Sequence, residues 1–153
     1  MTENIPLCRA SIEDAEIQAV TDVLQSGWLT HGPKTTEFEN MFAAAIGVEH
    51  AIAMNSCTSA LFLALLANDI RGEVIIPAFT FVATANAVVT AGATPVFAEV
   101  QPDTCNISAA DIEPLISART EAVIIVHFAG QCCGVDPMVD LCDRKGLLPL
   151  GDS

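Results

Sequence analysis

The chain has 153 residues, a hydrophobic content of 52% and a formal net charge of −13, from 19 acidic and six basic side chains. This length suffices for one domain with a buried core and is short for two, and the hydrophobic content excludes an extensively disordered chain. The acidic balance argues against nucleic acid or an anionic membrane as a partner.

The N-terminal part of the chain predicts helices. Ser11 with Asp14 three residues later is typical of a helix start, and an apolar stripe at helical spacing then runs to Gly27. A second helix is expected from Pro33 to Gly47. Its apolar side chains are expected to face inward, namely those of Phe38, Met41, Phe42, Ala45 and Ile46.

From residue 51 onward, short apolar runs alternate with helical stretches. Strands are expected at 51–54, 73–77, 94–98, 122–126 and 147–150, and helices near 58–67, 80–91, 109–116 and 136–145. Nearly continuous apolar strands that alternate with helices are typical of a parallel sheet buried on both faces. The expected fold class is therefore α/β, a parallel-rich and incomplete sheet with helices on both faces. Residues 1–50 would form an N-terminal helical segment, and residues 51–153 a partial α/β domain.

Small polar residues begin the helix that is expected after residues 51–54. The first N–H groups of a helix lack intrahelical partners and lie at the positive end of its dipole, so they attract anions. Cys57, Thr58 and Ser59 are small enough to let a phosphate approach that end. The alternative is an ordinary serine or threonine helix cap, which is the more frequent role of such a sequence.

Two further candidates follow other strands of the expected sheet. Phe79 and Phe81 follow residues 73–77, where a ring can stack on a flat cofactor, and core packing is the alternative. Asp152 follows residues 147–150, and a helix cap is its alternative role. The carboxyl ends of parallel strands share one edge, where ligands bind. A phosphate cradle, an aromatic ring and an acid that pairs with a pyridinium nitrogen together suit pyridoxal 5′-phosphate (PLP).

The sequence predicts neither a metal site nor export of the protein. The six cysteines have no C-x-x-C spacing and the three histidines lie far apart in the sequence, so no metal site is expected. The N-terminus has no apolar signal core. Two stretches, 51–68 and 74–98, carry no charge, but neither is a continuous run of about 20 apolar residues. We therefore expect reduced thiols, a cytoplasmic location and no membrane span.

Four stretches of the chain resemble, in order, the N-terminal portion of the DegT/DnrJ/StrS-type sugar aminotransferases, which are PLP enzymes of fold type I. These stretches are SGWLTHGPKTTEFE (26–39), NSCTSALFLALLA (55–67), GEVIIPAFTFVATANAVVTAGATPVFAEVQPDTCNI (72–107) and VHFAGQCCGVDPMVDLCDRKGLLPLGD (126–152). They cover nearly the whole chain and somewhat under half of a typical member. The resemblance implies an N-terminal fragment of the family's large domain.

The resemblance also implies roles for individual residues. Thr58 and Ser59 match the phosphate-binding pair, and Phe81 matches the aromatic that stacks on the cofactor ring. Asp152 matches the acid at the pyridine nitrogen. Cys57 stands where a glycine is common and is the fifth expected cofactor-binding residue. Trp28 and Thr30 match a stretch that, in the family, lies near the entrance of the substrate-binding site and the dimer interface. An aromatic anchor between two helices is the alternative for Trp28.

The chain departs from the family pattern at two points. Gly151 stands where an acid is usual before the aspartate. The Schiff-base lysine lies downstream of that aspartate in the family, and the chain's lysines, Lys34 and Lys145, match no such motif. An amine nucleophile at a fixed place is needed for this chemistry, so no catalytic residue is assigned. The chain is interpreted as a fragment that is inactive alone.

As a member of this family, the protein is expected to transaminate a nucleotide-linked keto-sugar to an amino sugar. The resemblance implies glutamate as amino donor and a homodimer that shares its active sites. Three alternatives remain open: a PLP-dependent sugar dehydratase of the same family, with histidine in place of the lysine; a non-catalytic cofactor-binding or dimerisation fragment; and a hydrolase that uses Cys57, His127 and Asp152.

Overall fold

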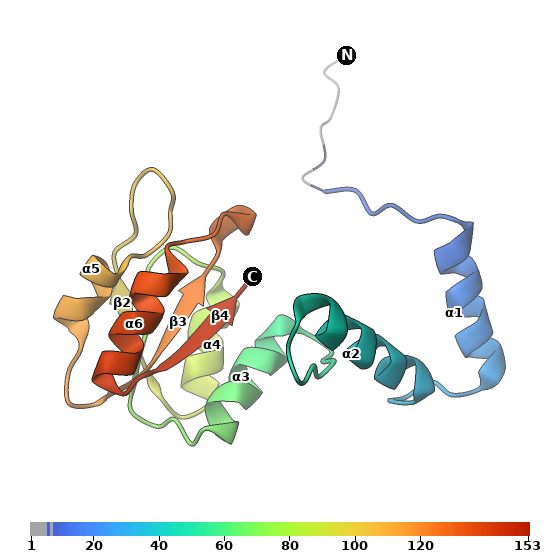
Figure 1. Cartoon of the computed structure of the whole chain (residues 1–153), viewed down its shortest axis with the longest axis horizontal. Coiled ribbons are helices and arrows are strands. Elements are labelled where there is room, and N and C mark those ends of the chain that lie inside the picture. The colour runs from blue at the N-terminus through green and yellow to red at the C-terminus, as the bar shows by residue number, and fades with distance from the viewer. Residues whose placement is uncertain (1–5, 7) are drawn as a thin grey trace, which may run out of the picture. The chain divides into compact units, whose positions relative to one another are not determined.

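The computed structural model describes residues 6 and 8–153 and divides into two compact units, Met1–Ala53 and Met54–Ser153. The helices and strands of both units are labelled in Figure 1. In the part of the chain that is described, no helix combines the length and apolar character that a membrane crossing requires.

The N-terminal unit holds two helices, α1 (Asp14–Ser26) and α2 (Pro33–Ile46). The expected cap at Ser11 is wrong, because the N-cap of α1 is Glu13. Glu13 and Glu16 form a reciprocal capping box, in which the Glu13 N–H donates to the Glu16 carboxylate at 2.8 Å. Both helices end, as expected, at glycines with left-handed φ angles of 73° and 79°, a conformation that other residues adopt only at a cost.

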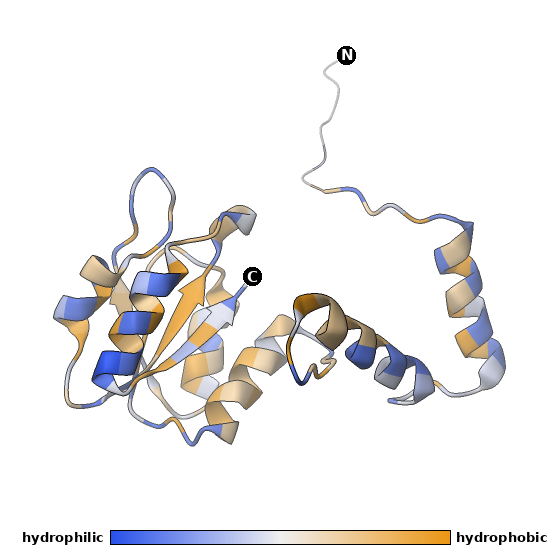
Figure 2. Cartoon of the chain, in the orientation of Figure 1, coloured by the Kyte–Doolittle hydropathy of each residue, from blue (hydrophilic) through white to orange (hydrophobic). Residues whose placement is uncertain are grey.

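The apolar side chains of α2 do not face inward within this unit, which corrects the expectation from their spacing. Of the α2 residues, only Ala43 is buried. The five expected to be buried, Phe38, Met41, Phe42, Ala45 and Ile46, are exposed. Apolar and polar residues also alternate along α1, none of whose residues is buried (Figure 2). A pair of helices has no third layer to cover both apolar stripes, so these faces lie open in the unit as described.

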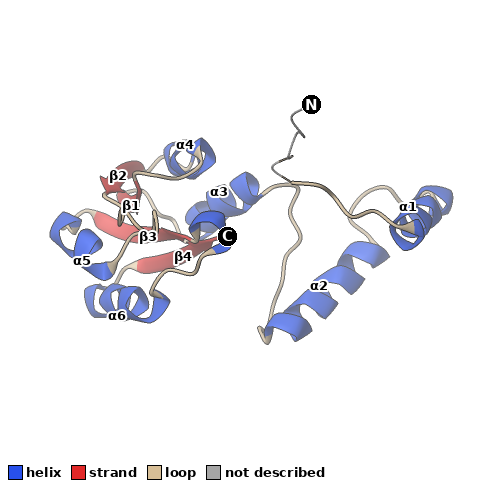
Figure 3. Ribbon diagram, turned by 90° about the horizontal axis from the view of Figure 1, so that it is seen from above, coloured by secondary structure: helices blue, strands red, loops and turns tan. Residues whose placement is uncertain are grey.

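The C-terminal unit is built on a parallel four-stranded sheet in the order β2-β1-β3-β4. The strands are β1 (Glu73–Pro77), β2 (Thr94–Ala98), β3 (Thr120–Val126) and β4 (Leu148–Asp152). The helices are α3 (Cys57–Ala67), α4 (Val82–Thr90), α5 (Ala109–Ile112) and α6 (Val135–Lys145), with short turns η1 (Glu113–Leu115) and η2 (Phe128–Gly130). Figure 3 shows α3 and α4 on one side of the sheet and α5 and α6 on the other.

Alternate residues of the central strands divide the core into two layers. Val74 and Ile76 of β1 pack with α3 and α4, whereas Ile75 between them packs with α5 and α6. This follows from the two-residue period of a strand, which sends successive side chains to opposite faces. With helices on both faces, every residue of β1 is buried, which explains the apolar sequence of its residues 74–77.

One expected strand is absent and one expected helix is divided. Residues 51–54 have an apolar sequence, but no strand of the described chain pairs with them, and a strand forms only with a hydrogen-bonding partner. The Ala53 N–H instead donates to the Glu39 carboxylate at 2.9 Å. The helix expected at 109–116 is a four-residue α-helix followed by a 3-10 turn that contains Pro114.

Two carboxylates connect β1 and β3 at the amino end of the sheet. Glu73 accepts a hydrogen bond from the Ser117 hydroxyl at 2.6 Å and pairs with Arg119. Glu121 accepts the backbone N–H groups of Arg71 and Gly72 at 2.7 and 2.8 Å. This end of the sheet is therefore closed by paired polar groups, and a ligand would have to displace them.

We expect Gly72→Ala to destabilise the chain by about 1–3 kcal/mol, the usual cost of overpacking. A Cβ at Gly72 would overlap the Arg119 backbone carbonyl, which cannot rotate away as a side chain does. Urea denaturation checks this, with Gly151→Ala as control, since a Cβ there meets nothing within 4 Å. The control should change stability by less than about 0.5 kcal/mol. Equal effects of the two substitutions would refute the steric argument.

The second expectation concerns acid stability. The Ser117 hydroxyl and then the Arg119 guanidinium lower the pKa of Glu73 below its ordinary value of 4.5, against the opposing effect of burial. Because the folded pKa is the lower one, ionised Glu73 stabilises the fold above about pH 4.5, and this stability is lost as pH falls through the folded pKa.

Glu73→Gln should therefore reduce stability at pH 7 and flatten its decline below pH 4.5, as measured by urea denaturation monitored by circular dichroism. Ser117→Ala, which removes the leading donor alone, should flatten the decline in part. An acid decline in Glu73→Gln as steep as in the unchanged chain would contradict the assignment.

Candidate functional site

A cavity of about 230 Å³ lies at the carboxyl end of the sheet. It is lined by the starts of α3 and α4 and by the end of β4, through Cys57, Thr58, Leu61, Phe81, Ala83, Thr84, Asp152 and Ser153. The structure thus brings together four of the five residues expected to bind a cofactor, from three separate segments. The fifth, Ser59, does not line the cavity. This volume is below the roughly 300–1,000 Å³ of pockets for drug-sized ligands, so it suits a small ring and not a nucleotide-sugar.

The start of α3 presents backbone donors to this cavity. Ser56 caps the helix by accepting the Ser59 N–H at 3.1 Å, and the hydroxyls of Ser56 and Ser59 lie 3.0 Å apart. No acceptor among the described residues takes the N–H of Cys57 or Thr58. Two N–H groups without a described acceptor therefore lie at the positive end of an 11-residue helix, an arrangement that favours anions. The Ser59 N–H is engaged by the cap, whereas its hydroxyl accepts from Ser56 and keeps its own proton, so a phosphate contact of Ser59 stays a prediction.

Phe81 is not a core aromatic, which excludes the alternative considered for it. It is the N-cap of α4, and 78% of the residue is exposed beside the cavity. Phe79 points to a different partner, since its ring packs on Phe128 with centroids 5.0 Å apart. Burying a phenylalanine side chain is worth about 1.5–3 kcal/mol, so a flat ligand that covered Phe81 would gain from the contact.

Both oxygens of the Asp152 carboxylate accept hydrogen bonds. Oδ1 accepts from the Cys57 thiol, with sulfur and oxygen 3.2 Å apart, and Oδ2 accepts from the Thr84 hydroxyl at 2.9 Å. The Thr80 hydroxyl oxygen lies 3.0 Å from that of Thr84. Neither threonine was expected from the sequence to belong to the site. Their spacing of four residues, which places both on one side of a helix start, is the available signal.

Cys57, His127 and Asp152 do not form a nucleophilic relay. Burial, and then the hydrogen bond to Asp152, raise the pKa of the Cys57 thiol, which is the opposite of what a nucleophile needs. The His127 ring nitrogen Nδ1 lies 3.2 Å from the sulfur of Cys133, while the His127 backbone N–H donates to the Asp152 carbonyl at 2.9 Å. These contacts contradict the hydrolase alternative.

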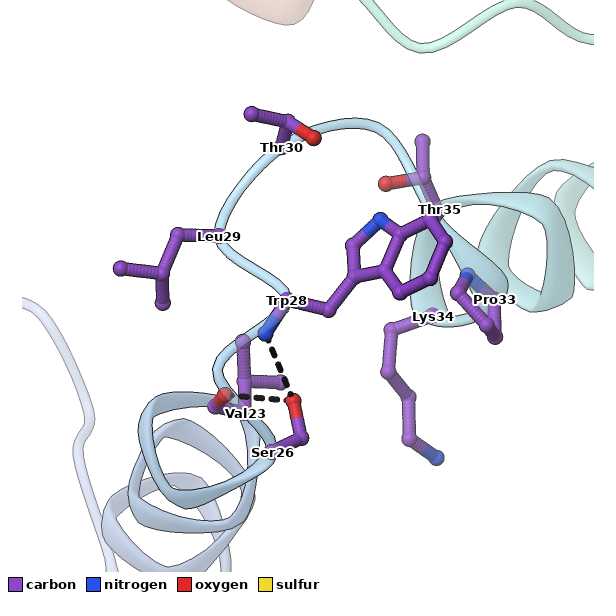
Figure 4. Close-up of a pocket in the computed structure, with 9 residues that line it drawn as sticks. Val23, Ser26, Trp28, Leu29, Thr30, Pro33, Lys34 and Thr35 are labelled. Atoms are coloured by element: carbon purple, nitrogen blue, oxygen red, sulfur yellow. Dashed lines mark hydrogen bonds between the residues drawn. The ribbon is translucent and has the colours of Figure 1, made fainter.

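Trp28 and Thr30 line a separate cavity of about 500 Å³ within the N-terminal unit (Figure 4). The indole nitrogen of Trp28 donates to the His31 carbonyl at 2.9 Å, and the ring fills the space that a side chain at Gly32 would need. These contacts favour a role for Trp28 as an anchor of the connection between α1 and α2. Contact of either residue with a substrate stays a prediction.

Neither lysine is among the residues that line the Asp152 cavity. Lys34 forms an ion pair with Glu37 at 2.7 Å, and Lys145 lies 4.0 Å from Glu113. Among the residues described, no three histidine, cysteine or acidic side chains are grouped as metal ligands. The arrangement can therefore hold a small planar heterocycle by an anionic substituent, a face and a protonated nitrogen. It offers no amine of its own to that heterocycle.

Comparison with known proteins gives consistent matches over nearly the whole chain. The model of the DegT/DnrJ/EryC1/StrS aminotransferase family matches residues 10–153. The spore coat polysaccharide biosynthesis protein SpsC of Bacillus subtilis is 46% identical over 97% of this chain and 39% of its own length. A UDP-4-amino-4-deoxy-L-arabinose–oxoglutarate aminotransferase of Shewanella sediminis is 43% identical over 99% of this chain and 39% of its length.

A solved structure agrees with these sequence matches. The PLP form of Spr1654 from Streptococcus pneumoniae matches with a TM-score of 0.88 and 35% identity, over 99% of this chain and 39% of that one. The chain thus spans about 39% of the length of the curated relatives that it matches.

The thiol of Cys57 offers a test of the site without any ligand. Asp152→Asn removes the negative charge with little change in size, so the pKa of Cys57 should fall. Because the thiolate is the reactive form, iodoacetamide should alkylate Cys57 severalfold faster in this variant at pH 8. Mass spectrometry of the Cys57 peptide measures this, with the exposed Cys132 as internal reference. An unchanged rate would mean that the thiol does not sense the carboxylate.

Proposed function

The chain belongs to the DegT/DnrJ/EryC1/StrS aminotransferase family, and from this premise we propose that it forms the cofactor-binding part of a PLP-dependent enzyme that converts a nucleotide-linked keto-sugar to an amino sugar. Its parallel sheet with helices on both faces is that of PLP-dependent aminotransferases of fold type I, of which it covers a part. The observation that supports the proposal is the single cavity where Thr58, Phe81 and Asp152 meet.

The lining of this cavity fits PLP in chemistry and in size. The free N–H groups of Cys57 and Thr58, with the Thr58 hydroxyl, would bind the phosphate. None of the eight lining residues is basic, so the helix start itself supplies the attraction for the anion. The exposed Phe81 ring would cover one face of the cofactor and exclude water from it.

Asp152 would hold a proton on the ring nitrogen. An ionised carboxylate is an acceptor only, so it favours the protonated ring over the neutral one. When bound, the cofactor supplies an electron sink for a carbanion at the amino-bearing carbon, and its protonated nitrogen strengthens that sink. Proton transfer at that carbon requires a base other than Asp152, which this proposal assigns to the ring nitrogen, and we assign it to the lysine that the family carries downstream of the aspartate.

The substrates and the second subunit are proposed on the basis of the relatives and the exposed surface. The Shewanella relative is named for a UDP-linked amino sugar and oxoglutarate, which supports a nucleotide-sugar acceptor and glutamate as the amino donor. The exposed apolar residues of α1 and α2 support a homodimer, with Trp28 and Thr30 near the substrate. All six cysteines are free, which supports a reducing, cytoplasmic compartment.

Titration of the chain with PLP tests the proposal directly. We expect weak, reversible binding, followed by the change in PLP absorbance and by calorimetry. Thr58→Ala and Asp152→Asn should each weaken binding by about tenfold, because each removes a hydrogen bond to a charged group. The control Thr90→Ala, at the exposed far end of α4, should bind as the unchanged chain does.

With glutamate and a UDP-linked keto-sugar, the 153-residue chain should show no turnover. A protein extended to the length of its relatives should transaminate the sugar. No PLP binding by the folded chain, or binding that neither substitution affects, would overturn the proposed cofactor site.

A further inference from the structure

We propose that Thr84, ordered by Thr80, is a positioning residue that fixes the Asp152 carboxylate and leaves its Oδ1 oxygen to face the ring nitrogen of the cofactor. The inference rests on the proposed function, because the ring is that of PLP. Thr84 acts through Asp152, and Thr80 acts through Thr84.

The direction of the hydrogen bonds follows from the number of protons available. An ionised carboxylate has no proton to give, so the Thr84 hydroxyl must donate to Asp152 Oδ2 across 2.9 Å. A hydroxyl has a single proton, so Thr84 can only accept from Thr80 across the 3.0 Å between their oxygens. The three side chains therefore form a series of hydrogen bonds in which Thr80 donates to Thr84 and Thr84 donates to Asp152.

The burial of Thr84 makes this series of hydrogen bonds rigid. Only 1% of Thr84 is exposed, and the residue lies in the first turn of α4. A β-branched side chain in a helix has few rotamers, and a buried hydroxyl keeps its partner because losing it costs about 1–3 kcal/mol. Oδ2 is therefore the fixed oxygen of the carboxylate.

The other oxygen, Oδ1, has a partner that is easily replaced. Its donor is the Cys57 thiol, and an S–H group is a weak donor. Cys57 is exposed and lines the cavity, so it can turn aside when a ligand enters. A protonated ring nitrogen forms a shorter and stronger charge-assisted hydrogen bond with Oδ1. The thiol thus keeps Oδ1 paired until the ring replaces it.

A merely structural role for Thr84 predicts a different pattern of ligand binding. If Thr84 only filled the core, its loss would weaken every ligand of the cavity alike. If it positions Asp152, its loss weakens only a ligand whose ring has a nitrogen opposite Oδ1. PLP and its 1-deaza analogue, in which CH replaces the ring nitrogen, separate these two cases.

The experiment compares the affinities of Thr84→Val and Thr84→Ser for both ligands by calorimetric titration. Thr84→Val keeps the shape and removes the hydroxyl, so we expect PLP binding to weaken about tenfold and 1-deaza-PLP binding to change less than about twofold. Thr84→Ser keeps the hydroxyl and should retain PLP affinity within about threefold. An equal loss for both ligands, or no loss for PLP, would overturn the inference.

Thr80→Val keeps the test decisive if Thr84→Val does not fold, which urea denaturation will show. It removes the donor to Thr84 at a less buried position, and should weaken PLP more than the 1-deaza analogue. An unchanged ratio of the two affinities would overturn the inference. If the unchanged chain does not bind PLP, the proposed function fails and this inference with it. PLP binding that depends on Asp152 but on neither threonine refutes this inference alone.

Discussion

The parallel pairing of β4 with β3 is the interaction on which the rest of the site depends. Its register places Asp152 opposite Val126, the last residue of β3, and the next residue, His127, donates its N–H to the Asp152 carbonyl at 2.9 Å. The backbone of Asp152 is thereby fixed at the carboxyl end of the sheet. Its side chain can then reach two helix starts that come earlier in the chain, through Cys57 of α3 and Thr84 of α4.

The two ends of the sheet differ in how far their polar groups are paired. At the amino end, the carboxylates of Glu73 and Glu121 are paired with donors on neighbouring segments, so this end has little left to offer a ligand. At the carboxyl end, the Cys57 and Thr58 N–H groups have no described acceptor and the Phe81 ring is exposed. The exposed ring forgoes the free energy of burial, and the open donors and the ring are both what an anionic, planar ligand would cover.

Sequence alone predicted the elements whose signal is local. The strands at 73–77 and 94–98 were predicted with their observed bounds, because each is a short, mostly apolar run between turns. Burial on both faces explains this sequence for β1 but not for β2, an edge strand whose residues are mostly exposed or half-buried. The strand expected at 51–54 failed because pairing depends on a neighbour that composition does not reveal. The gathering of Thr58, Phe81 and Asp152 was predictable from the shared edge of parallel strands. Thr84 was not predicted, since its four-residue spacing from Thr80 is a weak signal and its role becomes visible only through its contact with Asp152, 68 residues later.

The thiol at Cys57 gives this chain a property that the usual glycine would not. With glycine at that position, Oδ1 of Asp152 would have no side-chain donor beside it and would rely on water. With serine, a hydroxyl would bind the carboxylate more strongly than a thiol does and compete better with an entering ring. A thiol is intermediate in the strength of its hydrogen bond to Asp152. It pairs with the carboxylate in the free chain, and a charged donor would replace it. If the proposed cofactor binds, the residue at the start of α3 would thus set how readily the acid at the end of β4 accepts a ring nitrogen.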